Sequence, residues 1–319
     1  MHQYEKIMVV ISIFMTMGVF GNVNVIVAIA RKKVLRTKRG MLILFLSIAH
    51  LVCNIFQLIV IAENFFDDPE MYPFLKLPRY FNYCIVHSFF MDFQSFLYVS
   101  IALDHFLDVV IPLRYKLWNK TCYILAMLIF PIGLSIFYKI VSIISWSDFM
   151  WSFCFISLIP VPPPHQIFKD LNVVYNMTTT FIIIVSFCSA LIKSKSIHSR
   201  TPRTGRFEEE KVKMFRSTFF MVVIYAGLWG LLKITIRIVD FIRYYDIYID
   251  LNFYSVLMLV PNFCQTYFVT YFLSPKLRKA YQEQLHWMTC GKLFPKIFKK
   301  PESRVTSKDC VDTIIRDHI

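Results

Sequence analysis

Long apolar stretches alternate with short polar connections along most of the chain. Each stretch matches the length of a helix that crosses roughly 30 Å of hydrocarbon, which takes about 20 residues. The first, fifth and seventh stretches contain no Asp, Glu, Lys or Arg, as expected of helices that satisfy their own backbone in lipid. The pattern predicts an all-α membrane protein, a seven-transmembrane helix bundle. Its spans lie near 7–30, 41–62, 81–111, 121–145, 171–192, 215–241 and 251–273.

A shorter amphipathic segment, "SPKLRKAYQEQLHW" (274–287), follows the last span. Ser274 suits the N-cap of a helix and Pro275 suits its first position. Three apolar residues recur at every fourth position and share one face of that helix. These are Leu277, Tyr281 and Leu285. We therefore expect a short basic helix that lies on the inner membrane surface.

Composition agrees with this class and charge adds the orientation. The chain is 56% hydrophobic and only 18% charged, against roughly 25% charged in ordinary soluble domains. Its Lys and Arg residues gather at 31–39, 113–120, 193–216 and from 276 onward, while 63–80 carries more acid than base. Basic loops stay in the cytoplasm, so we expect the N-terminus outside and the C-terminus inside.

The same distribution bears on partners and domains. The net charge of +14 is spread over alternate connections, which favours a lipid bilayer as partner and argues against nucleic acid. Residues 1–287 are predicted to form one membrane domain, followed by a cytoplasmic tail over 288–319. We expect a multi-pass protein of the plasma membrane.

Motifs for enzyme chemistry are not evident. The chain has no HExxH, no GxSxG, no glycine-rich phosphate loop and no Cys-x-x-Cys pair, so we expect no enzyme activity, cofactor or metal. A transporter or ligand-gated channel is the alternative. Such a protein is expected to carry helices broken at matching positions of two halves. Pro131 and Pro261 are the candidates for such breaks, and they do not occupy matching halves.

Four stretches carry a resemblance to a known family. They are "GNVNVIVAIARKKVLRTKRG" (21–40), "LSIAHLVC" (46–53), "ALDHFLDVVIPLRY" (102–115) and "NFCQTYFVTYFLSPKLRKAYQEQL" (262–285). The chain is similar, over roughly 18–287, to nematode serpentine chemoreceptors of the srsx type, within the rhodopsin-like G-protein-coupled receptors. The resemblance implies an extracellular small molecule or peptide as ligand, a heterotrimeric G protein as partner, and a plasma membrane location that includes the sensory cilium.

The resemblance also implies a cytoplasmic interface at the end of the third span. Its predicted G-protein contacts are Asp104, His105, Pro112, Arg114 and Tyr115. An Asp facing lipid costs several kcal/mol, whereas one at the inner boundary can meet water, basic residues or a partner. The alternative is an ion pair of Asp104 or Asp108 with a nearby Lys or Arg.

Two histidines depart from the pattern of the wider class. His105 stands where an Arg is expected, and it lacks the fixed positive fork of a guanidinium. We hypothesise a weak, pH-sensitive latch between His105 and the acidic cluster 208–210, so that His105→Arg lowers ligand-independent signalling. His50 stands where an acidic residue is usual. We interpret it as a core histidine bonded to a neighbour such as Asn22, with metal binding as the alternative.

Ligand contacts are expected near the outer ends of the helices. The candidates are Asp92, Trp229, Lys233, Arg237 and Asp240. Lys233, Arg237 and Asp240 share one face of the predicted sixth helix. One hypothesis has Lys233 and Arg237 contact an anionic or polar ligand above Trp229. The other pairs Arg237 with Asp240 while Lys233 reaches outward. Lys139, on the fourth span, is interpreted as a side chain that reaches toward the membrane surface.

Two cysteines fall on the oxidising side of the predicted topology. Cys84 lies near the outer end of the third span and Cys154 lies in the long outer connection. We expect them to form a disulfide that holds this connection over the pocket mouth. The spacing from Cys84 to Asp104 is about one helical turn shorter than is usual in the class.

Overall fold

The computed structural model describes residues 2–66, 77–144, 219–225, 227–228 and 260–289, with single positions between 174 and 192. These residues form helices and connections without any strand. The long helices are α1 (His2–Arg31), α2 (Lys38–Phe66), α3 (Leu77–Val110) and α5 (Lys120–Ile144). The short ones are η1 (Lys33–Leu35), α4 (Pro112–Leu117) and α9 (Pro275–Met288). Residues 260–273 form a further helix that leads into α9.

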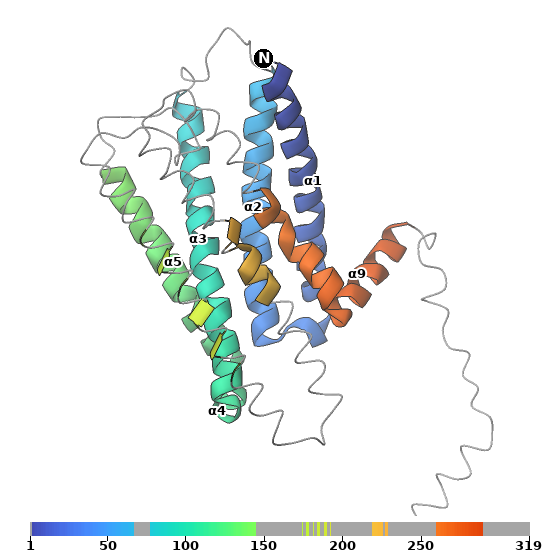
Figure 1. Ribbon diagram of the computed structural model, residues 1–319, viewed down its shortest axis with the longest axis vertical. Coiled ribbons are helices and arrows are strands. Elements are labelled where there is room, and N and C mark those ends of the chain that lie inside the picture. The colour runs from blue at the N-terminus through green and yellow to red at the C-terminus, as the bar shows by residue number, and fades with distance from the viewer. Residues whose placement is uncertain are drawn as a thin grey trace, which may run out of the picture.

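Four long helices stand side by side, with α2 between α1 and α3, and α5 on the far side of α3 (Figure 1). Each contains a segment long and apolar enough to cross a membrane. These segments are Met8–Arg31, Lys38–Ile59, Ile85–Asp108 and Lys120–Ile140. The first four predicted spans are therefore confirmed to within a few residues. The described helical positions of 174–192, 219–228 and 260–273 fall within the other three spans, whose remaining residues lie outside the described part.

The core of the bundle is built from large apolar side chains of α1, α2 and α3, joined by residues of α5, 219–225, 260–273 and α9. Its fully buried members include Val25, Leu42, Leu46, Leu97 and Ile101. On α5, by contrast, several large apolar side chains are more than half exposed. They are Leu125, Ile129, Phe130 and Phe137. An apolar face of this extent fits contact with lipid tails.

Glycine allows a close approach between α1 and the helix over 260–273. A Cβ atom placed on Gly21 would lie 2.7 Å from the Cβ of Tyr267, a separation that real Cβ atoms do not show. Small residues at helix contacts let backbones pack closely in membranes, where packing is a main source of association. Gly21 therefore sets how the last helix of the bundle meets the first.

The predicted amphipathic helix is present as α9, with bounds one residue later than expected and with Pro275 in its first turn. Ser274 occupies the N-cap but its side chain makes no capping hydrogen bond. Leu277 and Tyr281 are buried, and the Tyr281 hydroxyl lies 2.9 Å from Thr270 Oγ1. The helix packs against α1, so its apolar face is covered by protein.

Candidate functional site

Asp104 lies at the centre of a buried polar cluster near one end of the bundle. Arg39 Nε lies 3.1 Å from Asp104 Oδ2, and Arg39 Nη2 lies 3.4 Å from Asp108 Oδ2. The hydroxyls of Tyr115 and Tyr123 donate to the other oxygen, Asp104 Oδ1, at 2.8 and 3.0 Å. Both carboxylate oxygens of Asp104 are thus bonded, and its exposed fraction is 0%. We call these five residues the Asp104 cluster.

The cluster joins four helices, and local sequence signals place each member. Asp104 and Asp108 are four residues apart on α3, so both carboxylates face the same way. Arg39 lies in the first turn of α2, where the N–H of Gly40 donates to Thr37 Oγ1 at 3.0 Å. Thr37 therefore caps the start of α2, two residues before Arg39.

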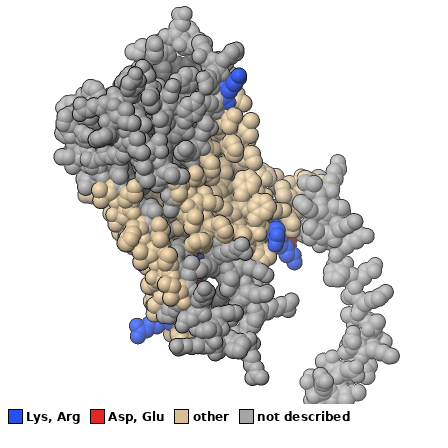
Figure 2. Space-filling model, viewed as in Figure 1, with Lys and Arg blue, Asp and Glu red and all other residues tan. Residues whose placement is uncertain are grey.

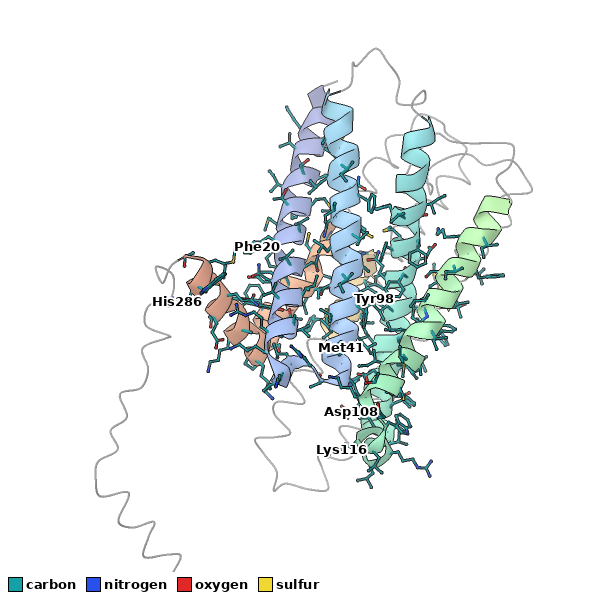
Figure 3. All side chains as sticks on the ribbon, turned by 180° about the vertical axis from the view of Figure 1, so that it is seen from behind. Phe20, Met41, Tyr98, Asp108, Lys116 and His286 are labelled. Atoms are coloured by element: carbon teal, nitrogen blue, oxygen red, sulfur yellow. The ribbon has the colours of Figure 1, made fainter. Side chains whose placement is uncertain are left out.

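The two tyrosines reach Asp104 from the chain that follows α3. Tyr115 lies on α4, which starts at Pro112 directly after α3 ends. Tyr123 lies in the first turn of α5, which is capped by Asn119 Oδ1 through the N–H groups of Thr121 and Cys122 at 2.9 and 3.3 Å. Figure 3 labels Asp108 on α3 and Lys116 on α4 at this end of the bundle.

A second cation closes the cluster from the side of α2. The Lys38 ammonium donates to the backbone carbonyl of Tyr115. It also lies 4.4 Å from the ring centre of Tyr115 and 4.9 Å from that of Tyr123. Trp118 stacks on Tyr123 with ring centres 5.7 Å apart. Burial and the neighbouring Asp104 raise the pKa of the Tyr115 phenol, so this hydroxyl stays a donor to the carboxylate.

The predicted interface residues occupy this end of the molecule, with different exposures. His105, like Asp104, is buried. Pro112 and Tyr115 are partly buried, and Arg114 is exposed. Of the two roles weighed for Asp104, the structure contains the intramolecular ion pair. The contact with a G protein stays a prediction. The acidic residues of the hypothesised His105 latch, at 208–210, lie outside the described residues.

Sequence reasoning missed two features of this end. In the sequence Arg39 is only one of the basic residues that orient the chain, but in the structure it is buried and forms a salt bridge. Leu113 and Leu117, next to the predicted interface residues, are 79% and 84% exposed on α4. The available signal is that the two leucines are four residues apart, flank Arg114 and Lys116, and follow a proline.

The ligand candidates at the other half of the bundle are only partly described. Asp92 on α3 pairs with Lys139 on α5, with Nζ 2.7 Å from Oδ2. Lys139 is largely buried, so the interpretation that it reaches toward the membrane surface is wrong. The opposite charge of Asp92 holds it inside the bundle. The remaining candidates lie outside the described residues. They are Trp229, Lys233, Arg237 and Asp240.

The expected disulfide stays a prediction. Cys84 lies in α3, but its side chain and the whole of Cys154 are outside the described residues. The cysteines whose side chains are described are all free. They are Cys53, Cys122, Cys188 and Cys264.

A buried polar layer ties α1 and α2 to the helix over 260–273. His50 is fully buried, and its Nδ1 lies 3.1 Å from Thr266 Oγ1, so it is a hydrogen-bonded core histidine as interpreted. The partner is Thr266 and not Asn22, which corrects the expectation. Asn22 Nδ2 instead donates to the backbone carbonyls of Gly18 and Phe263, at 2.9 and 2.8 Å. Among the described residues, no group of three or more His, Cys, Asp or Glu is placed to hold a metal.

Comparison with known proteins agrees with this architecture. Residues 15–285 match the family described as "Serpentine type 7TM GPCR chemoreceptor Srsx". No curated protein matches the chain. The matched residues cover most of the molecule, including every helix of the Asp104 cluster, and the family is not a family of enzymes. The chain therefore belongs to the Srsx family of serpentine seven-transmembrane chemoreceptors.

Proposed function

We propose that the chain is a chemosensory receptor of the plasma membrane that activates a heterotrimeric G protein. In this proposal the N-terminus lies outside and α4 and α9 face the cytoplasm, as the basic connections indicate. An extracellular small molecule or peptide binds between the outer halves of the helices. The family supports the receptor role, and the surface of α4 supports the identity of the partner class.

The exposed leucines of α4 carry the proposal. Leu113 and Leu117 are among the most exposed large apolar side chains of the described residues. They lie beyond the segment of α3 that is apolar enough to cross a membrane, which ends at Asp108, so the proposal places them outside the lipid tails. Large apolar side chains that project from a basic surface are typical of partner interfaces. Arg114 and Lys116 lie beside them and favour an acidic partner surface.

The Asp104 cluster gives this surface a fixed position. Tyr115 anchors α4 to Asp104, and Lys38 donates to the carbonyl of the same tyrosine. A helix of six residues has too few hydrogen bonds to be stable alone, so these contacts hold it in place. A change at Asp104 is thereby transmitted to the exposed leucines of α4.

The ligand site is proposed at the other half of the bundle. Asp92 lies twelve positions before Asp104 on α3, which corresponds to about 18 Å along a helix. Charged groups inside a membrane bundle mark functional sites more often than structural ones. The Asp92–Lys139 pair, with the candidates at Trp229, Lys233 and Arg237, is therefore proposed to line the pocket.

The test measures G-protein recruitment without a known ligand. Receptor variants are expressed in cells, permeabilised and treated with apyrase, and binding of nucleotide-free G-protein heterotrimers is measured at equal surface expression. Leu113→Ala is expected to lower recruitment several-fold, because an interface anchor is lost. The matched control is Leu125→Ala on the lipid-facing side of α5. Unchanged recruitment in Leu113→Ala, or an equal loss in Leu125→Ala, would contradict the proposal.

A further inference from the structure

Cations outnumber acids where the end of α1 meets α9. This surface is formed by Arg31, Lys33, Lys279 and Trp287, and we call it the corner surface. All four residues are exposed. Figure 2 shows Lys and Arg residues beside α9 and others near α4, at separate places on this face of the molecule. The corner surface is therefore distinct from the surface that we propose for the G protein.

One stripe of α9 forms half of the corner surface. Lys279, Glu283 and Trp287 recur at every fourth position and so lie along one face. The end of α1 crosses this stripe. Lys32 pairs with Glu283, and the Arg31 guanidinium lies 5.8 Å above the Trp287 ring. These two contacts place the basic end of α1 directly on the outer face of α9.

The cations of this region are not balanced by acids. Glu283 is the only Asp or Glu in 260–289, and 21–40 contains none. The carboxylate of Glu283 is already paired with Lys32. Lys33 and Lys279 form no ion pair with any residue that the structure describes. Within the part of the chain that the structure describes, the corner surface therefore carries positive charge that no acidic side chain neutralises.

Exposed apolar side chains adjoin these cations. Trp287 is 73% exposed, and the next residue, Met288, is also exposed. On α1 the neighbouring flank includes the exposed Phe20, which Figure 3 shows on the same side of the molecule as His286 of α9. A tryptophan between cations and an apolar flank is the arrangement typical of the membrane–water interface.

We propose that the corner surface binds the headgroup of an anionic phospholipid of the cytoplasmic leaflet. Lys33 and Lys279 attract the phosphate and the headgroup carboxylate, while Trp287 lies at headgroup level and the acyl chains run along the flank of α1. Each basic side chain near an anionic leaflet is attracted to its headgroups. The inference rests on the proposed orientation, in which α9 faces the cytoplasm.

The test uses the full chain purified in detergent. The protein is incubated with equal amounts of phosphatidylserine and phosphatidylcholine, and native mass spectrometry counts the lipids that stay bound. The wild type is expected to retain more phosphatidylserine than phosphatidylcholine. The double variant Lys33→Gln/Lys279→Gln is expected to lower that preference about thirtyfold, because two cations are removed. The matched control, Lys116→Gln/Lys120→Gln, removes the same charge from another exposed surface and is expected to retain it.

Three outcomes would overturn the inference. They are equal retention of the two lipids by the wild type, equal losses in both double variants, and displacement of the lipid by inorganic phosphate alone, which would indicate a general anion site. Melting curves of both variants check that they are folded. Recruitment of the G protein is measured on the same samples. Because lipid retention does not require coupling, failure of one proposal is distinguishable from failure of the other.

Discussion

Arg39 of α2 and Asp104 of α3 form a buried salt bridge, with Nε 3.1 Å from Oδ2, 65 positions apart in the chain. The same guanidinium reaches Asp108 through Nη2. A planar guanidinium can span two carboxylates that are one helical turn apart, which a lysine ammonium does with less precision. The residue after Asp104 is His105, so the cation that neutralises this carboxylate comes from another helix.

Arg39→Gln should destabilise the receptor strongly. The substitution leaves the carboxylate of Asp104 buried without its cation, and breaking a buried pair costs about 3 to 5 kcal/mol. We expect a clearly lower melting temperature of the purified receptor. Arg39→Lys should recover part of the loss, and Arg114→Gln, at an exposed position, should change it little. A melting temperature of Arg39→Gln equal to that of the wild type would refute the structural role.

Tyr115→Phe and Tyr123→Phe should act together. Each removes a hydrogen bond to Asp104 Oδ1, and a bond to a charged group contributes about 1.5 to 3 kcal/mol. Because both donate to the same oxygen, one tyrosine still satisfies it when the other is lost. The double variant should therefore lose more thermal stability than the sum of the single variants. Strictly additive losses would show that the two hydroxyls act independently.

Asp92 and Lys139 should behave as a coupled pair. Asp92→Asn or Lys139→Met alone leaves one charge inside the bundle, which costs more than removing both. We expect lower surface expression for each single variant and a partial recovery in the double variant. The measurement is a double-mutant cycle by flow cytometry. If the double variant is worse than both single variants, the pair is not coupled as the structure indicates.

Gly21→Ala should disturb the contact between α1 and the helix over 260–273. The added Cβ would collide with the Cβ of Tyr267 at 2.7 Å, and overpacking of this kind costs about 1 to 3 kcal/mol. Gly133→Ala on α5 is the matched control, because a Cβ there meets no atom within 4 Å. We expect a lower melting temperature for the first variant only. Equal effects of both would point to a general property of glycine in these helices.

The helices could be predicted from sequence because their signal lies in consecutive residues. A helix in lipid must satisfy its own backbone, so apolar length and basic flanks locate a span without knowledge of its neighbours. The positions of α1, α2, α3 and α5 follow from this. In α9, the start at Pro275 and the burial of Leu277 and Tyr281 follow from the amphipathic pattern of that segment. The short helix α4 was not predicted, because contacts with Asp104 and Lys38 hold it in place.

The sequence by itself determined the class of the protein, the number and order of its apolar spans, and the end of the bundle where Asp104 lies. Only the tertiary structure decided the partners of its charged and polar groups. Asp104 pairs with Arg39, Lys139 with Asp92, and His50 with Thr266. The reason is physical: electrostatic and hydrogen-bond energies depend on distances of a few ångströms. Which helices lie that close is decided by packing, not by any local pattern of residues.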